Sequence, residues 1–389
     1  MNFSICSMML TGHTPLKRQQ GVSLIELMVA MALGLAIVAA VGYVYVSGVG
    51  GYKVQDGQSR MQESARFVIE TVSRDVRMAG YFGCTRSDNL GNKGFVEVVA
   101  SQPVMTLDID WLNGGSNNTV LDRFVDTSYF IRGISASASN THPALPRYAK
   151  LMGSLKPGTD VLLVIRSGED QQNAVQDADP TTLAFTLPQK LPGVSDGDNV
   201  TMVISDCRVA RIFKPTYQSV SGSPTVRLNV QNGMNKNNNA TGAIDDLNGQ
   251  FGVESVVSLF TPSIFFVAKP TVVGRPSELR RVTIAQNEAS NYGRWSATGG
   301  EVVATGVETF QTSYMVTTNI GTSAATSREF SLAAMEASPS SWGNVTAVRI
   351  QFTMAGQDSG TSVVQADGKL RQTYDFVVGV RARQYKGVS

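Results

Sequence analysis

Glu26 is the one charged side chain in a long apolar run, residues 22–46. A carboxylate inside an apolar helix costs about 2.5 kcal/mol or more on membrane-insertion scales unless a partner compensates it. An α-amino group at Val22, which a cut after Gly21 would create, lies one helical turn away and supplies a cation in the same layer. Alternatively, Glu26 lies near the membrane edge and reaches water without a partner. The role of this carboxylate therefore depends on whether the chain is cut after Gly21.

The cysteines are relevant to the redox compartment in which the protein lies. Of the three, Cys6 precedes Gly21, which leaves Cys84 and Cys207 in the rest of the chain. A disulfide between these two would form only in an oxidising compartment such as the periplasm. By loop-closure entropy it would stabilise the fold by about 4 to 5 kcal/mol. Two unrelated buried thiols remain the alternative.

Side chains suited to catalysis or metal binding are sparse. After Gly21 the single histidine is His142, in a Thr-His-Pro context typical of a surface loop. The sequence has no His/Cys cluster with zinc spacing and no phosphate-binding Gly-rich loop. Asp196-Gly197-Asp198-Asn199 and Asp245-Asp246 could offer oxygens to Ca²⁺, but they lack EF-hand spacing and fit turn chemistry better. We therefore expect no enzyme, no metal and no cofactor.

The composition indicates a β-rich globular protein with balanced charge. Of 389 residues, 42% are hydrophobic, 16% are charged and 37 are Gly, which favours strands and turns. The formal net charge is +2, but Lys17 and Arg18 precede Gly21, so 31 basic and 31 acidic residues follow it. Nucleic-acid phosphates normally require a clustered excess of Lys and Arg. Direct nucleic-acid binding is therefore not expected.

The element that positions Glu26 is a predicted helix over residues 22–46. At about 1.5 Å per residue it exceeds the ~30 Å hydrocarbon thickness of a bilayer. A secretory signal peptide has a shorter apolar region, although Ala39-Ala40 leaves that alternative open. Lys17 and Arg18 precede the span, and residues 47–51 after it carry no charge. The positive-inside rule therefore places the N-terminus in the cytoplasm and the rest of the chain across the membrane.

Residues 47–82 are predicted to form a glycine hinge and a second, amphipathic helix. Three Gly residues lie within residues 48–51, and each costs a helix about 1 kcal/mol, so we expect a kink or break there. A helical pattern resumes from about Lys53 to Met78. Its apolar stripe is expected to pack on the protein core and consists of Met61, Ala65, Val68, Val72 and Val76.

Residues 83–389 are expected to form a β-rich domain, as one body or as two subdomains. Apolar runs predict strands at residues 161–165, 200–204, 209–213 and 264–268. Residues 346–354 and 374–380 alternate between apolar and polar side chains, which predicts two half-buried strands. Polar stretches at residues 231–246 and 317–327 are expected to be exposed loops. The fold class is thus α+β, with a long N-terminal helix packed on a large β-rich domain.

The stretch Lys17-Arg18-Gln19-Gln20-Gly21, followed by Val22-Ser23-Leu24-Ile25-Glu26, resembles a prepilin processing site. The resemblance implies a 21-residue leader removed by prepilin peptidase after Gly21, methylation of Val22, and a role for Glu26 in binding the amine of a neighbouring subunit. Two features depart from the pattern. The first mature residue is usually Phe, and the leader is longer than most, which fits a translation start at Met8 or Met9.

The body also resembles the PilW family of minor pilins. The order of segments that carries this resemblance is residues 78–84, the strand before Ser205-Asp206-Cys207, residues 302–314 and residues 342–350. It implies a Cys84–Cys207 disulfide and a pilin-like protein anchored in the bacterial inner membrane, with a periplasmic domain that later joins a pilus on the cell surface. It also implies other minor pilins and the major pilin as partners, at a tip complex that primes assembly.

Two alternatives stay open beside the minor pilin. One is a J-type pseudopilin of type II secretion, to which the PilW family is similar. The other is a tip module for cell adhesion, twitching motility or DNA uptake.

Overall fold

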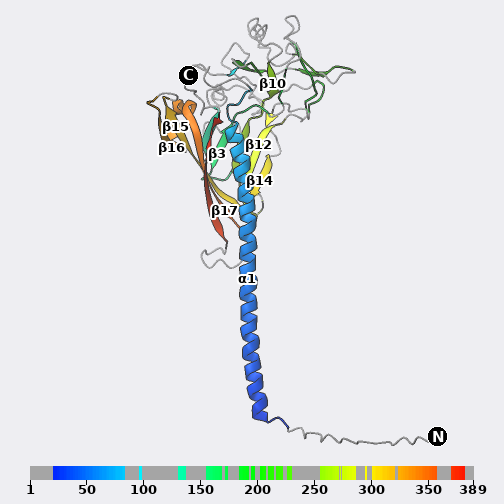
Figure 1. The fold of residues 1–389 in the computed structure, drawn as a ribbon, viewed down its shortest axis with the longest axis vertical. Coiled ribbons are helices and arrows are strands. Elements are labelled where there is room, and N and C mark those ends of the chain that lie inside the picture. Colours follow the sequence, from blue (N-terminus) through cyan, green and yellow to red (C-terminus); the bar gives the residue numbers. More distant parts are fainter. Residues whose placement is uncertain are drawn as a thin grey trace, which may run out of the picture. The chain divides into compact units, whose positions relative to one another are not determined.

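The computed structural model contains a long N-terminal helix followed by a β-rich unit, which is the α+β class expected from the sequence (Figure 1). The chain divides into two compact units, Met1–Gln55 and Asp56–Ser389. The structure describes residues 21–83, 96–98, 130–136, 155–168, 171–173, 184–191, 194–197, 202–206, 209–213, 216–221, 226–229, 255–270, 272, 274–285, 294–295, 300–319, 323–356 and 369–381.

Helix α1 is continuous from Leu24 to Arg77, so of the kink or break predicted at residues 47–51, the break is wrong. Each interior Gly costs a helix about 1 kcal/mol relative to Ala. A break would instead leave several backbone groups without partners, at a cost of several kcal/mol each in an apolar environment. A Cβ added at Gly48 or Gly51 would meet no neighbouring atom, so no contact within the chain forces the backbone out of the helix there.

The second half of α1 packs on the β-rich unit through the predicted apolar stripe. Met61, Ala65, Val68, Val72 and Val76 are all buried and belong to one core cluster with residues of the strands. The prediction that this stripe is core is confirmed.

A left-handed glycine ends helix α1, in the segment where the sequence predicts the end. Gly80 has φ +72° and donates its N–H to Ile165 O at 2.9 Å. A Cβ at this position would collide with the ring of Phe130, so glycine is required here.

The described strands form four sheets. The five-stranded sheet runs β1 (Val96–Val98), β7 (Val209–Phe213), β6 (Met202–Asp206), β10 (Val256–Leu259), β4 (Gln172–Asn173). The six-stranded sheet runs β13 (Arg294–Trp295), β12 (Glu278–Ala285), β11 (Ser263–Ala268), β3 (Asp160–Val164), β2 (Ile131–Ser135), with β14 (Glu301–Thr305) also paired to β12. The four-stranded sheet runs β16 (Thr326–Ser331), β15 (Val307–Thr318), β17 (Val345–Ala355), β18 (Arg371–Gly379), and the three-stranded sheet runs β5 (Ala184–Leu187), β9 (Val226–Asn229), β8 (Thr216–Ser219).

Most of these strand pairs are antiparallel; among the described pairs only β1 and β7 run parallel. Two short helices, α4 (Leu332–Ala337) and η4 (Pro339–Asn344), follow β16. The Ser331 side chain caps α4 by accepting the N–H of Ala334 at 3.4 Å. Neither helix was predicted from the sequence, because six residues are too few for a 3.6-residue period to show.

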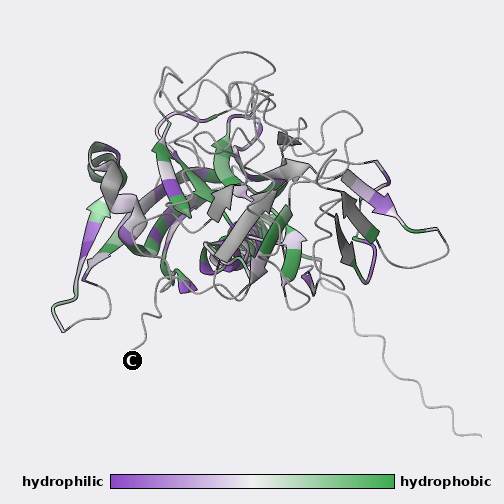
Figure 2. Cartoon of the chain, turned by 90° about the horizontal axis from the view of Figure 1, so that it is seen from above, coloured by the Kyte–Doolittle hydropathy of each residue, from purple (hydrophilic) through white to green (hydrophobic). Residues whose placement is uncertain are grey.

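The predicted strands lie where expected. The run predicted at residues 161–165 overlaps β3, which ends at Val164, and residues 209–213 are β7. Residues 264–268 are within β11, whose six residues are all buried. In β17 the side chains at 348, 350, 352 and 354 are buried, while Arg349 and Gln351 are exposed. Figure 2 shows hydrophobic residues distributed along the strands of this unit.

The loop predicted at residues 317–327 is too long. Thr317 and Thr318 continue β15, and Thr326 and Ser327 begin β16, with Thr317 paired to Ser327 and Thr318 to Thr326. Their hydroxyl groups lie 2.8 Å apart in both pairs. β-branched Thr favours strands, and cross-strand hydroxyl pairs stabilise a hairpin. Thr-rich composition therefore misled the loop prediction. The second predicted loop, residues 231–246, lies outside the described residues.

Candidate functional site

The predicted cleavage point lies in an exposed, non-helical segment. Residues 21–23 precede helix α1, whose first turn begins with the 3.1 Å hydrogen bond from Leu27 N–H to Ser23 O. Gly21 and Val22 are exposed, Val22 by 71%. Proteases act on exposed chain that is free of regular hydrogen bonding. The Gly21–Val22 peptide bond meets that requirement.

Glu26 lies in the first turn of α1, and its side chain is exposed. An acidic residue is favourable at this end of a helix because the unpaired N–H groups carry a partial positive charge. Val22 precedes Glu26 by four residues and lies just before the helix. After a cut at Gly21, the chain would present a new amine close to the helix end that carries the carboxylate.

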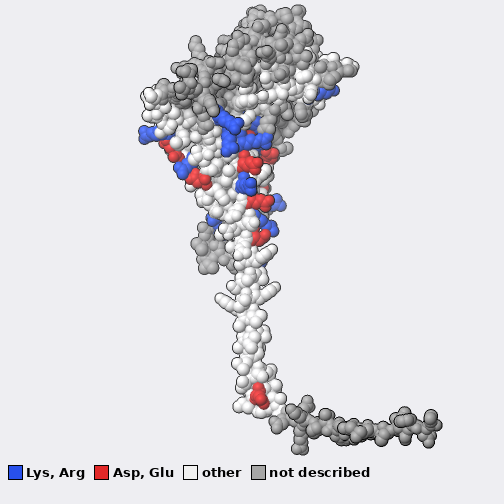
Figure 3. Space-filling view, in the orientation of Figure 1, with Lys and Arg blue, Asp and Glu red and all other residues white. Residues whose placement is uncertain are grey.

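The surface that follows Glu26 is apolar and uncovered within the chain. Glu26 is the one charged residue of residues 22–46, and Figure 3 shows acidic atoms near the start of this otherwise uncharged stretch of the helix. The large hydrophobic side chains from Val22 to Tyr52 are 39% to 78% exposed. By length and composition, α1 is the one helix among the described residues that could cross a membrane. A contiguous apolar surface of this size requires lipid or another protein to cover it.

A buried ion cluster, which was not predicted from the sequence, ties α1 to the six-stranded sheet. Asp75 is 1% exposed, and its carboxylate lies 3.0 Å from Arg166 Nη2 and 3.0 Å from Arg281 Nε. Arg281, on β12, also pairs with Glu301 on β14 at 3.1 Å. A signal was present, because Asp75 falls on the apolar stripe, three residues after Val72. A carboxylate on a buried helix face requires cations from the elements packed against it.

The sequence favours a turn over calcium binding for the group that begins at Asp196-Gly197. These two residues do lie in a turn. Asp196 Oδ1 accepts the backbone N–H of Ser219 at 2.7 Å, and Gly197 has φ +87°. Hydrogen bonds from Ser219 lower the pKa of the Asp196 carboxyl. Within the described part of the chain, no group of three or more His, Cys, Asp or Glu is placed to hold a metal ion.

Several other predicted positions lie outside the described residues. They are Lys17, Arg18, Cys6, Cys84, His142, Asp198, Asn199, Cys207, Asp245 and Asp246. The disulfide and the orientation signal therefore stay predictions.

Comparison with known protein families identifies residues 16–42 as the prokaryotic N-terminal methylation motif. No curated protein and no solved structure matches the chain. The motif covers Gly21, Val22, Glu26 and most of the exposed apolar surface. It indicates a type IV pilin-like or pseudopilin protein, and it implies processing by prepilin peptidase and assembly with pilus or pseudopilus components. An N-terminal apolar helix fits a membrane-anchored pilin.

Proposed function

We propose that this chain is a minor pilin, a structural subunit and not an enzyme, that joins a type IV pilus at its tip or initiation complex. Prepilin peptidase would cut after Gly21 and methylate Val22. The observation that carries the proposal is the methylation motif on a helix whose apolar side chains are uncovered from Val22 to Tyr52. That surface suits a subunit that passes from lipid into a helical assembly.

The first stage of this proposal is insertion in the bacterial inner membrane, with the N-terminus in the cytoplasm. Tyr45 follows Glu26 by 19 residues on the continuous helix, which is about 28 Å at 1.5 Å per residue. That length matches the ~30 Å hydrocarbon core. Tyr43 and Tyr45 are exposed by 78% and 71%, and tyrosine favours the membrane interface. Glu26 and Tyr45 would then lie at opposite edges of the hydrocarbon layer.

The second stage is packing against other pilins, with the β-rich unit in the periplasm and later on the cell surface. In an assembly, the apolar face of α1 would exchange lipid for neighbouring helices. Glu26 would then be enclosed by apolar side chains, where a carboxylate needs a cation. The methylated amine of a neighbouring subunit would supply it.

The tip position rests on the PilW-like order of segments in the body. A J-type pseudopilin remains the second candidate, because the methylation motif is common to pilins and pseudopilins. The balanced charge after Gly21 argues against unassisted DNA binding. A tip adhesion role would add a ligand to the same structural role.

The experiment compares processing and assembly of wild type and Glu26→Ala in the native host. N-terminal analysis of the membrane-extracted wild-type chain should start at methylated Val22. Glu26→Ala should still insert and be cut, yet its incorporation into sheared pili should fall roughly tenfold or more, since a hydrogen bond to a charged group is worth about 1.5 to 3 kcal/mol.

Glu63→Ala is the matched control, because Glu63 is an exposed glutamate further along the same helix. It should leave incorporation unchanged. A start other than Val22 would contradict the processing step, and unchanged piliation in Glu26→Ala would contradict the assembly role. Loss of type II secretion with intact pili would favour the pseudopilin.

A further inference from the structure

Asp160, the first residue of β3, links the six-stranded sheet to the four-stranded sheet. Its Oδ2 accepts two hydrogen bonds from Thr312 on β15, from the backbone N–H at 2.6 Å and from Oγ1 at 3.0 Å. The pairing of β16 with β15 ends at Ser313 and Ser331. Thr312 comes directly beyond that end, and the Asp160 carboxyl accepts its N–H. A side chain of one sheet thus completes the hydrogen bonding of the other.

The groups around this carboxyl are acids and hydroxyls. Tyr314 on β15 is fully buried and lies with its Oη 2.9 Å from Thr312 Oγ1, to which it donates. Glu336 on α4 accepts the N–H of Ser135 at 2.8 Å, and Ser135 pairs with Asp160 across β2 and β3. Among the described residues, Glu336 from α4 and Tyr314 from β15 are the titratable groups that face Asp160, and β2 contributes the uncharged Ser135.

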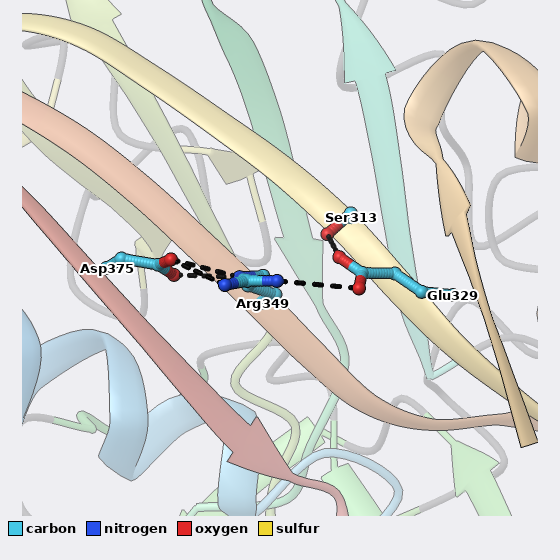
Figure 4. A network of polar contacts seen from close by, with 4 residues as sticks. All are labelled: Ser313, Glu329, Arg349 and Asp375. Atoms are coloured by element: carbon cyan, nitrogen blue, oxygen red, sulfur yellow. Dashed lines mark hydrogen bonds and ion pairs between the residues drawn. The ribbon is translucent and has the colours of Figure 1, made fainter.

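Asp375 in the four-stranded sheet differs from Asp160, because its partner is a cation. Figure 4 shows it facing Arg349, whose Nε and Nη2 donate to the carboxylate at 2.9 and 2.7 Å, while Arg349 also reaches Glu329. The hydrogen bond from Arg349 lowers the pKa of Asp375. Burial instead raises the pKa of Asp160 to about 6, although the Thr312 hydrogen bonds act to lower it. The charge of Glu336 adds to the rise.

We propose that Asp160, Thr312 and Tyr314 form a pH-sensitive latch between the two sheets, which holds them most firmly when Asp160 is protonated and loosens when it ionises. Protonation at Oδ1 removes a half-buried negative charge and its repulsion from Glu336, while Oδ2 still accepts the hydrogen bonds from Thr312. A carboxyl whose pKa is higher in the folded than in the unfolded chain contributes stability below about pH 4. That contribution is lost as the pH rises through about 6.

The test measures the protection of the Thr312 amide against hydrogen exchange in the full-length chain in detergent micelles, from pH 4.5 to 8. Protection is corrected for the intrinsic pH dependence of exchange. In the wild type it should fall about 10- to 100-fold across this range, as a shift of one to two pKa units requires. Asp160→Asn, which cannot ionise, should show a flat profile.

Asp375→Asn is the matched control and should keep the wild-type profile, because Asp375 is exposed and paired with Arg349. Glu336→Gln keeps Asp160 but removes the adjacent negative charge, so the fall in Thr312 protection should move to lower pH. This variant tests the latch even if Asp160→Asn does not fold. A flat wild-type profile, or the same pH dependence in Asp160→Asn, would overturn the proposal. So would a Glu336→Gln profile that stays at the wild-type pH.

Discussion

At the residue scale, three acids of this chain differ because their surroundings differ. Glu26 is exposed at the start of α1, Asp75 is buried between two arginines, and Asp160 is half-buried and hydrogen-bonded to Thr312. A buried charge is tolerated where cations or hydrogen bonds replace water, and otherwise its ionisation is suppressed. We therefore propose a different role for each of the three: assembly for Glu26, attachment of the helix for Asp75, and coupling of the sheets for Asp160.

Asp75→Asn should weaken the attachment of α1 to the six-stranded sheet. The change keeps the shape of the side chain but leaves Arg166 and Arg281 without the buried carboxylate. Breaking a buried ion pair from one side costs about 3 to 5 kcal/mol, so the free energy of unfolding should fall by that amount. Denaturant unfolding of the full chain in micelles, followed by tryptophan fluorescence, measures it.

Asp56→Asn is the control for this prediction. Asp56 likewise pairs with an arginine, Arg60, at 3.0 Å, but both residues lie on α1. The Asp56 side chain is 40% exposed and the Arg60 side chain is 76% exposed. An exposed pair contributes about 0 to 1 kcal/mol, so unfolding should hardly change. Equal effects of the two substitutions would show that the buried cluster is not what holds the helix.

At the element scale, a single glycine connects the six-stranded sheet to the four-stranded sheet. Gly306 lies between β14 and β15 with φ +87°; its N–H donates to Ser277 O, and its carbonyl accepts the N–H of Ala355, both at 2.8 Å. A Cβ at this position would lie 2.6 Å from Ala355 O. The turn thus requires glycine both for its left-handed backbone and for the close approach of β17.

Gly306→Ala should therefore destabilise the β-rich unit more than an ordinary left-handed glycine would. Left-handed backbone in a non-glycine residue costs about 1 to 2 kcal/mol, and the approach to Ala355 adds to it. Gly274→Ala separates the two effects, because Gly274 has φ +89° and a Cβ added there would meet no neighbouring atom. Thermal unfolding should rank wild type, Gly274→Ala and Gly306→Ala in descending stability. Equal losses in the two variants would exclude the contact with Ala355.

The elements whose apolar residues recur at a regular spacing were predicted from the sequence. The features that depend on hydrogen bonds to neighbouring turns or strands were not. The stripe from Met61 to Val76 and the alternation in β17 follow local rules, since one face of each is buried. The continuity of α1 through residues 47–51 went against local propensity, because the backbone hydrogen bonds of the helix outweigh the cost of its glycines. The extension of β15 to Thr318 was missed because polar composition predicts a loop, whereas Thr favours a strand once a partner strand lies beside it.

At the scale of the whole molecule, the chain joins a β-rich unit that has its own core to the first half of α1, which has none. The β-rich unit buries large aromatic side chains such as Phe265, Phe310 and Tyr314, whereas the large hydrophobic side chains from Val22 to Tyr52 stay uncovered. Such a chain needs lipid or other subunits around its first helix, which is consistent with the pilin-like motif at residues 16–42.

We also predict that the protein purified from the cell envelope has no free thiol, as the PilW resemblance implies for Cys84 and Cys207. Thiol titration of the unfolded mature chain measures this directly. Reduction should lower the free energy of unfolding by about 4 to 5 kcal/mol, because the bridge would close a loop of more than 100 residues. Two reactive thiols per chain would contradict the pairing, and Cys207→Ser should then have only a small effect.

The sequence by itself determined the processing motif, the apolar helix with Glu26, and the amphipathic stripe, because each depends on residue types at short, regular spacing. The tertiary structure alone decided that Asp75 meets Arg166 and Arg281, and that Asp160 meets Thr312. These partners lie about 90 to 200 residues apart along the chain. Local periodicity carries no information about such pairs, which form only when the sheets have found their order and register.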